Sequence, residues 1–149
     1  MVDKSVKEKD SNQADTLKYC ILALGRIASG DPTQAQDIVK QNGIITLILA
    51  LSFVDPNVIS SSLSALVSFA KYPENIKELL DNDCVTNLMK CFEEEKLKNP
   101  AICEEAISLI SCLSSDENAA KQIIEKGGIE KILAAMKLHP NNKIIAEQV

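Results

Sequence analysis

An apolar segment recurs three times along the chain. It runs from Gly43 to Leu51, from Cys84 to Phe92 and from Gly128 to Met136, at offsets of 41 and 44 residues. Within each copy the apolar side chains return every three or four positions, which predicts an α-helix. A repeat of this length indicates structural units that stack on one another, because one such unit cannot bury its apolar face alone.

The pattern predicts two further helices in each unit. Long apolar segments lie at residues 20–29, 62–71 and 105–114, and short amphipathic stretches lie at residues 34–41, 74–81 and 118–126. Leu66 and Leu109 occupy equivalent places in the long segments, and we expect both to be core residues. Each unit is therefore predicted to contain a short, a medium and a long helix.

The prolines provide an independent check on the repeat. Pro56, Pro100 and Pro140 follow the medium helices, whereas Pro32 and Pro73 come just before the short helices. The fixed φ and the missing N–H of proline suit a turn or the first residue of a helix. All five prolines therefore fall at two equivalent positions of the repeat unit. The helix boundaries that they mark agree with an all-α chain.

Three helices per unit resemble the armadillo repeat, whereas HEAT units usually have two. Residues 38–44 (IVKQNGI) and 123–129 (IIEKGGI) resemble the armadillo turn between the first and second helices. We expect a left-handed glycine at Gly43 and at Gly127 or Gly128, because helix C-termini commonly end in that conformation. The middle unit departs from the pattern, with residues 82–84 (NDC) in place of glycine.

The resemblance covers about residues 14–149 and implies an all-α, right-handed α-solenoid with about two full repeats and partial repeats at both ends. We expect a disordered polar tail at residues 1–13, the third helix of a partial repeat at 14–30, repeats at 31–72 and 73–115, and a truncated repeat at 116–149. The first and last apolar helix faces are left without a following unit. We therefore interpret the chain as a fragment of a longer armadillo protein, or as one whose ends pack against another copy.

Two branches of the armadillo family have third-helix patterns that can be compared with this chain. The importin-α branch carries Trp and, four residues later, Asn, which clamp a basic peptide. The equivalent positions here are Leu22 and Arg26, Ser64 and Ser68, and Ile107 and Ser111. None matches, which argues against a nuclear-transport-like cargo adapter. The catenin groove is strongly basic, whereas only Arg26 is basic here, so the catenin mode of binding acidic peptides is not expected either.

The inner stripe predicted from the long helices has three residues per helix at spacings of three and four, which place each triplet on one helix face. The candidate partner-binding residues are Tyr19, Leu22, Arg26, Ser61, Ser64, Ser68, Glu104, Ile107 and Ser111. Under the functional interpretation, hydroxyls and charges bind a peptide backbone, with Tyr19 or Leu22 as an apolar contact. Under the alternative, the serine-rich faces are close helix contacts or solvated surface.

Residues 93–98 (EEEKLK) lengthen the middle repeat. We interpret this segment as a solvated spacer that projects from the array, and the alternative is a recognition element, since insertions in solenoids often fall on a binding face. The formal net charge of −5 argues against nucleic acid or an anionic membrane as a partner. No stretch has the length of apolar sequence that a membrane span needs.

The cysteines do not form a recognisable metal motif. Cys84, Cys91, Cys103 and Cys112 lack the close paired spacing of structural zinc sites, and His139 is the single histidine. A catalytic thiol would need a neighbouring base, for which one histidine in a turn is weak support. We therefore predict no enzyme activity, no metal and no cofactor. Five cysteines, an odd number, favour a reducing compartment, the cytoplasm or the nucleus.

The function predicted from the sequence is a protein–protein interaction or scaffold module that binds a partner protein or an extended peptide on its helical surface. The alternative is a regulatory or targeting arm of a larger multidomain protein whose enzyme part lies outside this chain. Self-association through the open solenoid ends is a further possibility.

Overall fold

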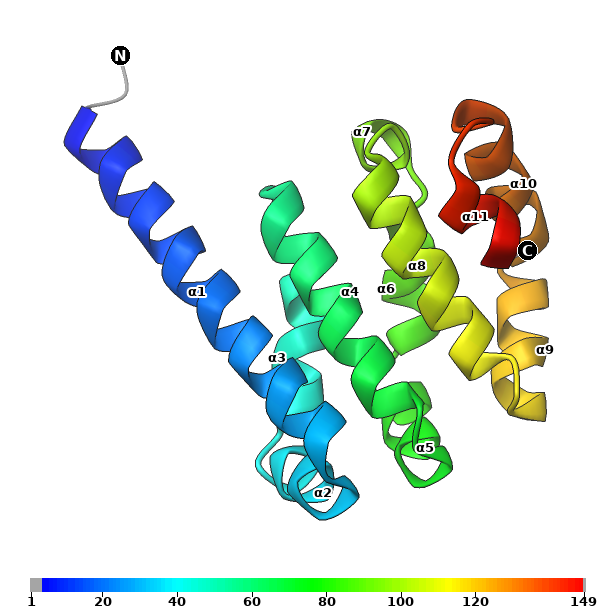
Figure 1. The fold of residues 1–149 in the computed structure, drawn as a ribbon, viewed down its shortest axis with the longest axis horizontal. Helices are drawn as coiled ribbons and strands as arrows, with labels where there is room; N and C mark the ends of the chain where they lie inside the picture. The colour runs from blue at the N-terminus through cyan, green and yellow to red at the C-terminus, as the bar shows by residue number, and fades with distance from the viewer. Residues whose placement is uncertain (1–3, 149) are drawn as a thin grey trace.

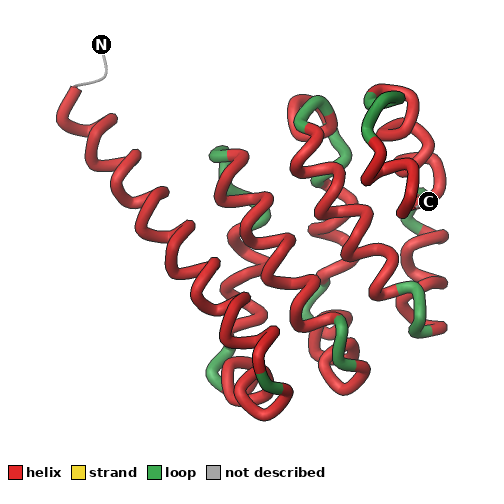
Figure 2. Tube along the Cα trace, in the orientation of Figure 1, coloured by secondary structure: helices red, strands yellow, loops and turns green. Residues whose placement is uncertain are grey.

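The structure is a computed structural model that describes residues 4–148, with the side chains of residues 12–93 and 95–147. Helices and short turns make up the whole of this described part (Figure 2). The helices are α1 (Lys4–Gly30), α2 (Pro32–Lys40), α3 (Gly43–Ala50), α4 (Pro56–Ala70), α5 (Pro73–Asp81), α6 (Cys84–Lys90), α7 (Glu94–Leu97), α8 (Pro100–Leu113), α9 (Glu117–Glu125), α10 (Gly128–Leu138) and α11 (Lys143–Gln148).

The helices form an array of two layers (Figure 1). The long helices α1, α4 and α8 stand side by side in one layer, and α11 continues that layer against α8. The second layer holds the short and medium helices, in which α2 packs on α5 and α6 packs on α9. This arrangement is the predicted all-α solenoid, in which each unit packs mainly on its neighbours.

Four helices in the array begin with proline, at Pro32, Pro56, Pro73 and Pro100. Before three of these, an Asp or Asn side chain accepts a hydrogen bond from a backbone N–H of the first turn. Asp31 accepts from Thr33 N at 2.7 Å, Asp55 accepts from Asn57 N at 2.8 Å, and Asn99 accepts from Ala101 N at 3.0 Å. These side chains satisfy N–H groups that have no partner inside the helix, which fixes where each helix starts.

The turn between the first and second helices has the same geometry in all three units. Its left-handed residues are Asn42 (φ 62°), Asp83 (φ 58°) and Gly127 (φ 75°). The expectation is confirmed for Gly127 but is wrong for Gly43, which is the first residue of α3 instead. Gly43 has a different constraint, because a Cβ there would lie 2.3 Å from Ile38 Cγ2 and 2.9 Å from Ile38 O. The glycine is required for close packing of α2 on α3.

Within the expected tail at residues 1–13, residues 4–13 are helical, because α1 begins at Lys4. Residues 1–3 lie outside the described part of the chain. Lysine, glutamate and glutamine favour helix, and no glycine or proline interrupts the chain before Gly25. A helix nucleated where Leu17 and Ile21 pack on the core can therefore extend back through the polar segment.

The core runs without interruption between the two layers. Leu47, Leu66, Leu88 and Leu109 have no exposed surface, and they come from α3, α4, α6 and α8. Leu66 and Leu109 are thus core residues, as predicted. The core fixes the phase of α4 and α8, and that phase decides which of their side chains face outward.

Candidate functional site

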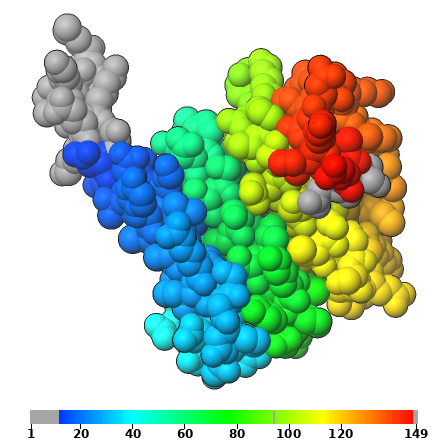
Figure 3. Space-filling model, viewed as in Figure 1, coloured from blue at the N-terminus to red at the C-terminus, as the bar shows by residue number. Residues whose placement is uncertain are grey.

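Helices α1 and α4 approach each other closely at Gly25 and Ala65. A Cβ built on Gly25 would lie 3.1 Å from the Cβ of Ala65, so only a glycine fits without a shift. Beside this contact the surface is hollowed, with a volume of about 220 Å³. The space-filling view looks onto the layer of α1, α4 and α8, where the surfaces of α1 and α4 adjoin (Figure 3). The hollow is lined by Ile21, Leu22, Gly25, Arg26, Ser29, Ser61, Ser64, Ala65 and Ser68.

The structure brings five of the nine predicted site residues together in this hollow. They are Leu22, Arg26, Ser61, Ser64 and Ser68. Their helical spacing, at i, i+3, i+4 and i+7, is what places them on facing sides of α1 and α4. Ser29 was missed, although it lies three residues after Arg26 and so continues the same helix face.

Two of the serines in the hollow bond only to their own helix. Ser68 Oγ donates to Ser64 O at 3.4 Å, and Ser29 Oγ donates to Gly25 O at 3.0 Å. Ser61 is different, because its hydroxyl reaches solvent in the hollow and has no hydrogen-bond partner among the described residues, although the residue is only 9% exposed. The hydroxyl of Ser61 is therefore available to a group that enters the hollow.

Arg26 is exposed and supplies the only charge among the residues that line the hollow. The ion pairs found between described side chains join Lys40 to Asp37, Lys98 to Glu95 and Lys131 to Glu93, and none involves Arg26. A guanidinium has five N–H donors and no acceptor. The hollow thus combines an apolar side from Leu22, several hydroxyls and one uncompensated cation.

The other four predicted residues lie outside this hollow. Tyr19 is 66% exposed and does not line it. Ser111 is exposed on α8. Ile107 is 2% exposed, so it offers almost no surface to a ligand. Helix α11 packs against α8, and its buried Ile145 joins the same core as Ile107.

Glu104 is partly buried where α8 meets the turn before α11. Its carboxylate accepts a hydrogen bond from Asn142 Nδ2, in the turn before α11. The neighbouring Glu105 is half-buried, and burial together with the charge of Glu104 raises the pKa of its carboxyl. Glu104 therefore positions the last helix, and the predicted stripe stops at α4.

Comparison with solved structures identifies the architecture. An engineered protein solved by a structural genomics consortium matches 91% of this chain with a TM-score of 0.81 and 24% identity, and this chain covers 53% of it. A designed armadillo repeat protein in complex with the peptide (KR)4 matches 90% of the chain with a TM-score of 0.78 and 20% identity, and is 55% covered. A computationally designed armadillo repeat protein for modular peptide recognition matches 89% with a TM-score of 0.76 and 19% identity, and is 54% covered.

The chain has the armadillo fold. It spans about half the length of each of these three solved proteins. No protein-family model and no curated protein matches it. At these identities the likeness establishes the architecture alone, and it places the hollow on the third helices of two successive armadillo units.

The insertion of the middle armadillo unit does not project from the array as expected. It forms the short helix α7 at one end of α8 (Figure 1), and side-chain contacts tie it to units on both sides. Lys96 Nζ donates to Leu51 O at the end of α3, at 3.0 Å. His139 Nε2, at the end of α10, lies 2.9 Å from Leu97 O. The interpretation as a solvated spacer is wrong, because these contacts fix the segment between neighbouring second helices.

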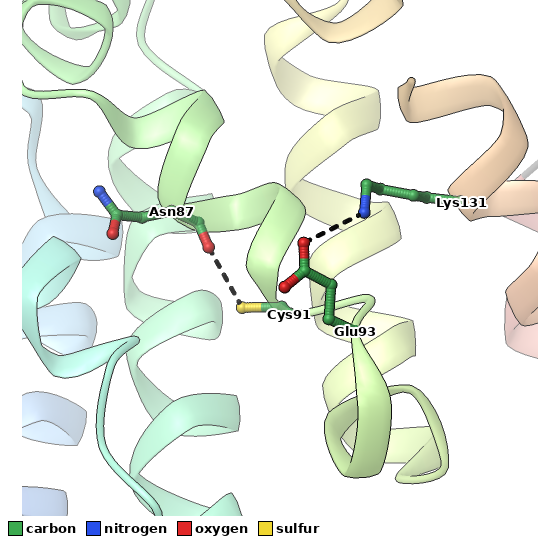
Figure 4. A network of polar contacts seen from close by, with 4 residues as sticks. All are labelled: Asn87, Cys91, Glu93 and Lys131. Carbon is green, nitrogen blue, oxygen red and sulfur yellow. Dashed lines mark hydrogen bonds and ion pairs between the residues drawn. The ribbon is translucent and has the colours of Figure 1, made fainter. Parts of the chain in front are cut away.

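A surface ion pair adds to this attachment of α7. Glu93 Oε1 lies 3.5 Å from Lys131 Nζ of α10, and the pair spans the gap between the insertion and the next armadillo unit (Figure 4). In the same region Cys91 Sγ contacts the carbonyl of Asn87 at 3.7 Å (Figure 4). The second thiol nearby, Cys103, contacts Leu97 O at 3.2 Å. Thiols thus act here as buried partners of backbone carbonyls.

The cysteines of the armadillo array are free thiols. Burial raises the pKa of Cys84 to about 12, with a smaller contribution from Cys91, and burial also raises the pKa of Cys91 to about 11. Such thiols stay protonated at neutral pH and are poor nucleophiles. Within the described residues no group of three or more His, Cys, Asp or Glu side chains could hold a metal ion. None of the described helices has both the length and the apolar character needed to cross a membrane.

Proposed function

We propose that this chain is a protein-interaction module that binds an extended segment of a partner protein along the hollow between α1 and α4. The observation that carries the proposal is that five of the predicted binding residues converge on one open hollow. A solved neighbour of the same fold, 20% identical, is a designed protein in complex with a peptide. That likeness supports a peptide as the kind of ligand and does not define its sequence.

The lining of the hollow suits a peptide backbone. Peptide N–H and C=O groups both need partners when they leave water, and serine hydroxyls can donate or accept. Ser61 and Ser64 form no hydrogen bond through their hydroxyls within the described part of the chain, so they can serve either role without breaking an existing bond. Leu22 supplies an apolar contact beside them.

A compartment is also proposed. Five free cysteines, three of them buried as protonated thiols, support a reducing environment such as the cytoplasm or nucleus.

The experiment is a selection of random twelve-residue peptides on the immobilised protein, followed by affinity measurement on the enriched sequences. Ser64→Trp fills the hollow and should abolish binding of the selected peptides. Ser111→Trp is the matched control, because it adds the same side chain at an exposed site of α8 outside the hollow. Failure to enrich any peptide would refute the proposal, and so would peptides that bind Ser64→Trp as tightly as the unaltered protein.

A further inference from the structure

The charge in the hollow makes the proposed ligand more specific. The side chains that line it include four serines, three apolar residues and one arginine, and none is acidic. A basic peptide side chain would meet Arg26 there without a compensating carboxylate. The hollow is therefore positively charged, whereas a surface that selects lysine or arginine is negatively charged.

Two features of the hollow indicate a bound oxyanion. The first is the guanidinium of Arg26, which has no ion-pair partner among the described residues. The second is Ser61, a residue that is 9% exposed and lines the hollow, and its solvent-accessible hydroxyl donates to no acceptor in the described part of the chain. A hydroxyl with no hydrogen-bond partner in the protein and an unpaired cation at one place are complementary to an acceptor-only group.

We propose that this hollow binds one carboxylate, the side chain of an Asp or Glu in the peptide segment, with Arg26 as the cation and Ser61 and Ser64 as hydroxyl donors. The inference rests on the proposed function, since it names the chemistry of the peptide that the hollow receives. It differs from recognition by a row of basic residues, because one cation serves one acidic side chain.

A carboxylate fits the hollow better than a phosphate does. A phosphorylated side chain carries close to two negative charges at neutral pH and is usually bound by several arginines. The hollow has a single positive charge, and the chain as a whole has a formal net charge of −5. A dianion would keep one uncompensated charge beside an acidic protein, whereas a monoanion is neutralised by Arg26.

The site can be tested with small probes by ¹H–¹⁵N NMR titration of the labelled protein. The probes are the N-acetyl, N-methylamide derivatives of aspartate, asparagine and phosphoserine. The aspartate probe should shift the amides of residues 21–29 and 61–68, and the asparagine probe should not. Arg26→Gln should weaken aspartate binding about tenfold or more, the size expected for a charged hydrogen bond.

The variants distinguish an effect of the Arg26 charge in the hollow from an effect of the net charge of the protein. Arg26→Lys should retain part of the affinity, and Ser61→Ala should weaken it while the charge stays in place. Lys137→Gln is the matched control, because it removes one positive charge from an exposed site on α10 and should leave the affinity unchanged. An effect of Lys137→Gln as large as that of Arg26→Gln would overturn the assignment to the hollow.

Other results would also overturn the proposal. These are no aspartate-induced shifts in α1 and α4 at tens of millimolar, equal binding of the asparagine probe, or tighter binding of phosphoserine. Peptide selection distinguishes this failure from failure of the proposed function. The selected peptides could lack Asp and Glu, lose binding to Ser64→Trp and bind Arg26→Gln as tightly as the unaltered protein. That result would support the interaction module and refute the carboxylate site. Absence of selected peptides would remove the module itself.

Discussion

Single leucines at the centre of the long helices show how much each position contributes to stability. Leu66 and Leu109 are fully buried between the two layers. We predict that replacing either with Ala lowers the free energy of unfolding by about 2–5 kcal/mol, through lost burial and the cavity left behind. Urea denaturation followed by circular dichroism measures this. Ser64→Ala and Ser68→Ala should change it little, because neither hydroxyl bonds outside its own helix. Equal effects in the two pairs would contradict the helix phase.

Gly43 and Gly30 form a second contrast between single residues. A Cβ at Gly43 would meet Ile38 Cγ2 at 2.3 Å, whereas a Cβ at Gly30 would meet nothing within 4 Å. Gly43→Ala should therefore cost about 1–3 kcal/mol by overpacking. Gly30→Ala should stabilise by about 0.4–1 kcal/mol, because alanine loses less chain entropy on folding. Thermal unfolding of the two variants should show midpoints on opposite sides of the unaltered protein, and a shift in the same direction would refute this account.

The buried thiols predict a dependence of stability on alkaline pH. The pKa of Cys84 is raised from 9.0 to about 12 in the folded protein, so the unfolded chain loses this proton first as the pH rises. The stability linked to Cys84 is fully present below about pH 9 and decreases as the pH rises toward 12. Cys84→Ala should reduce the loss of stability between pH 8 and pH 10.5, measured by urea denaturation. The exposed Cys20→Ala is the control and should leave the loss unchanged.

At the scale of the element, α7 shows that a four-residue helix can be fixed by its neighbours. An isolated helix of this length is not stable in water. Its position comes from Lys96 donating to Leu51 O and from His139 at the carbonyl of Leu97. The insertion is therefore part of the folded array.

The contact of Lys96 gives a prediction for α7. Lys96→Met keeps most of the apolar stem but removes the partly buried bond to Leu51 O, and it should cost about 1–2 kcal/mol. Lys98→Met is the control, because the ion pair of Lys98 with Glu95 is mostly exposed, and such pairs contribute about 0–1 kcal/mol. Differential scanning calorimetry should show a lower midpoint for Lys96→Met only. Equal midpoints would mean that α7 is not anchored at this point.

At the scale of the whole molecule, the last two helices, α10 and α11, differ from the middle of the array. Ile129, Leu133 and Ile144 are about half exposed on α10 and α11, an apolar surface with no helix packed over it in the described part. Surfaces of this kind promote association. We expect concentration-dependent self-association in sedimentation velocity, reduced by Leu133→Glu. Val54→Glu, which changes an exposed apolar residue of the α3–α4 turn, should not reduce it. A monomer at all concentrations would remove this expectation.

Most of the architecture was predictable from the sequence because solenoid packing is local. Recurring apolar positions and prolines fix the helices, and each unit meets only its neighbours. The candidate site was half predictable, since helical spacing placed Leu22, Arg26 and three serines on facing sides of α1 and α4. Spacing could not show that α11 and its neighbouring turn engage α8, which buries Ile107 and holds Glu104. Those contacts join residues far apart in the sequence.

The attachment of α7 also has a mechanical consequence. Solenoids of stacked units bend through small rotations between neighbouring units. Here a brace of side-chain contacts links the end of α3 to α10 through α7, along one edge of the array. Stretching that edge requires these bonds to break. The array should therefore be stiffer toward one direction of bending than toward the other.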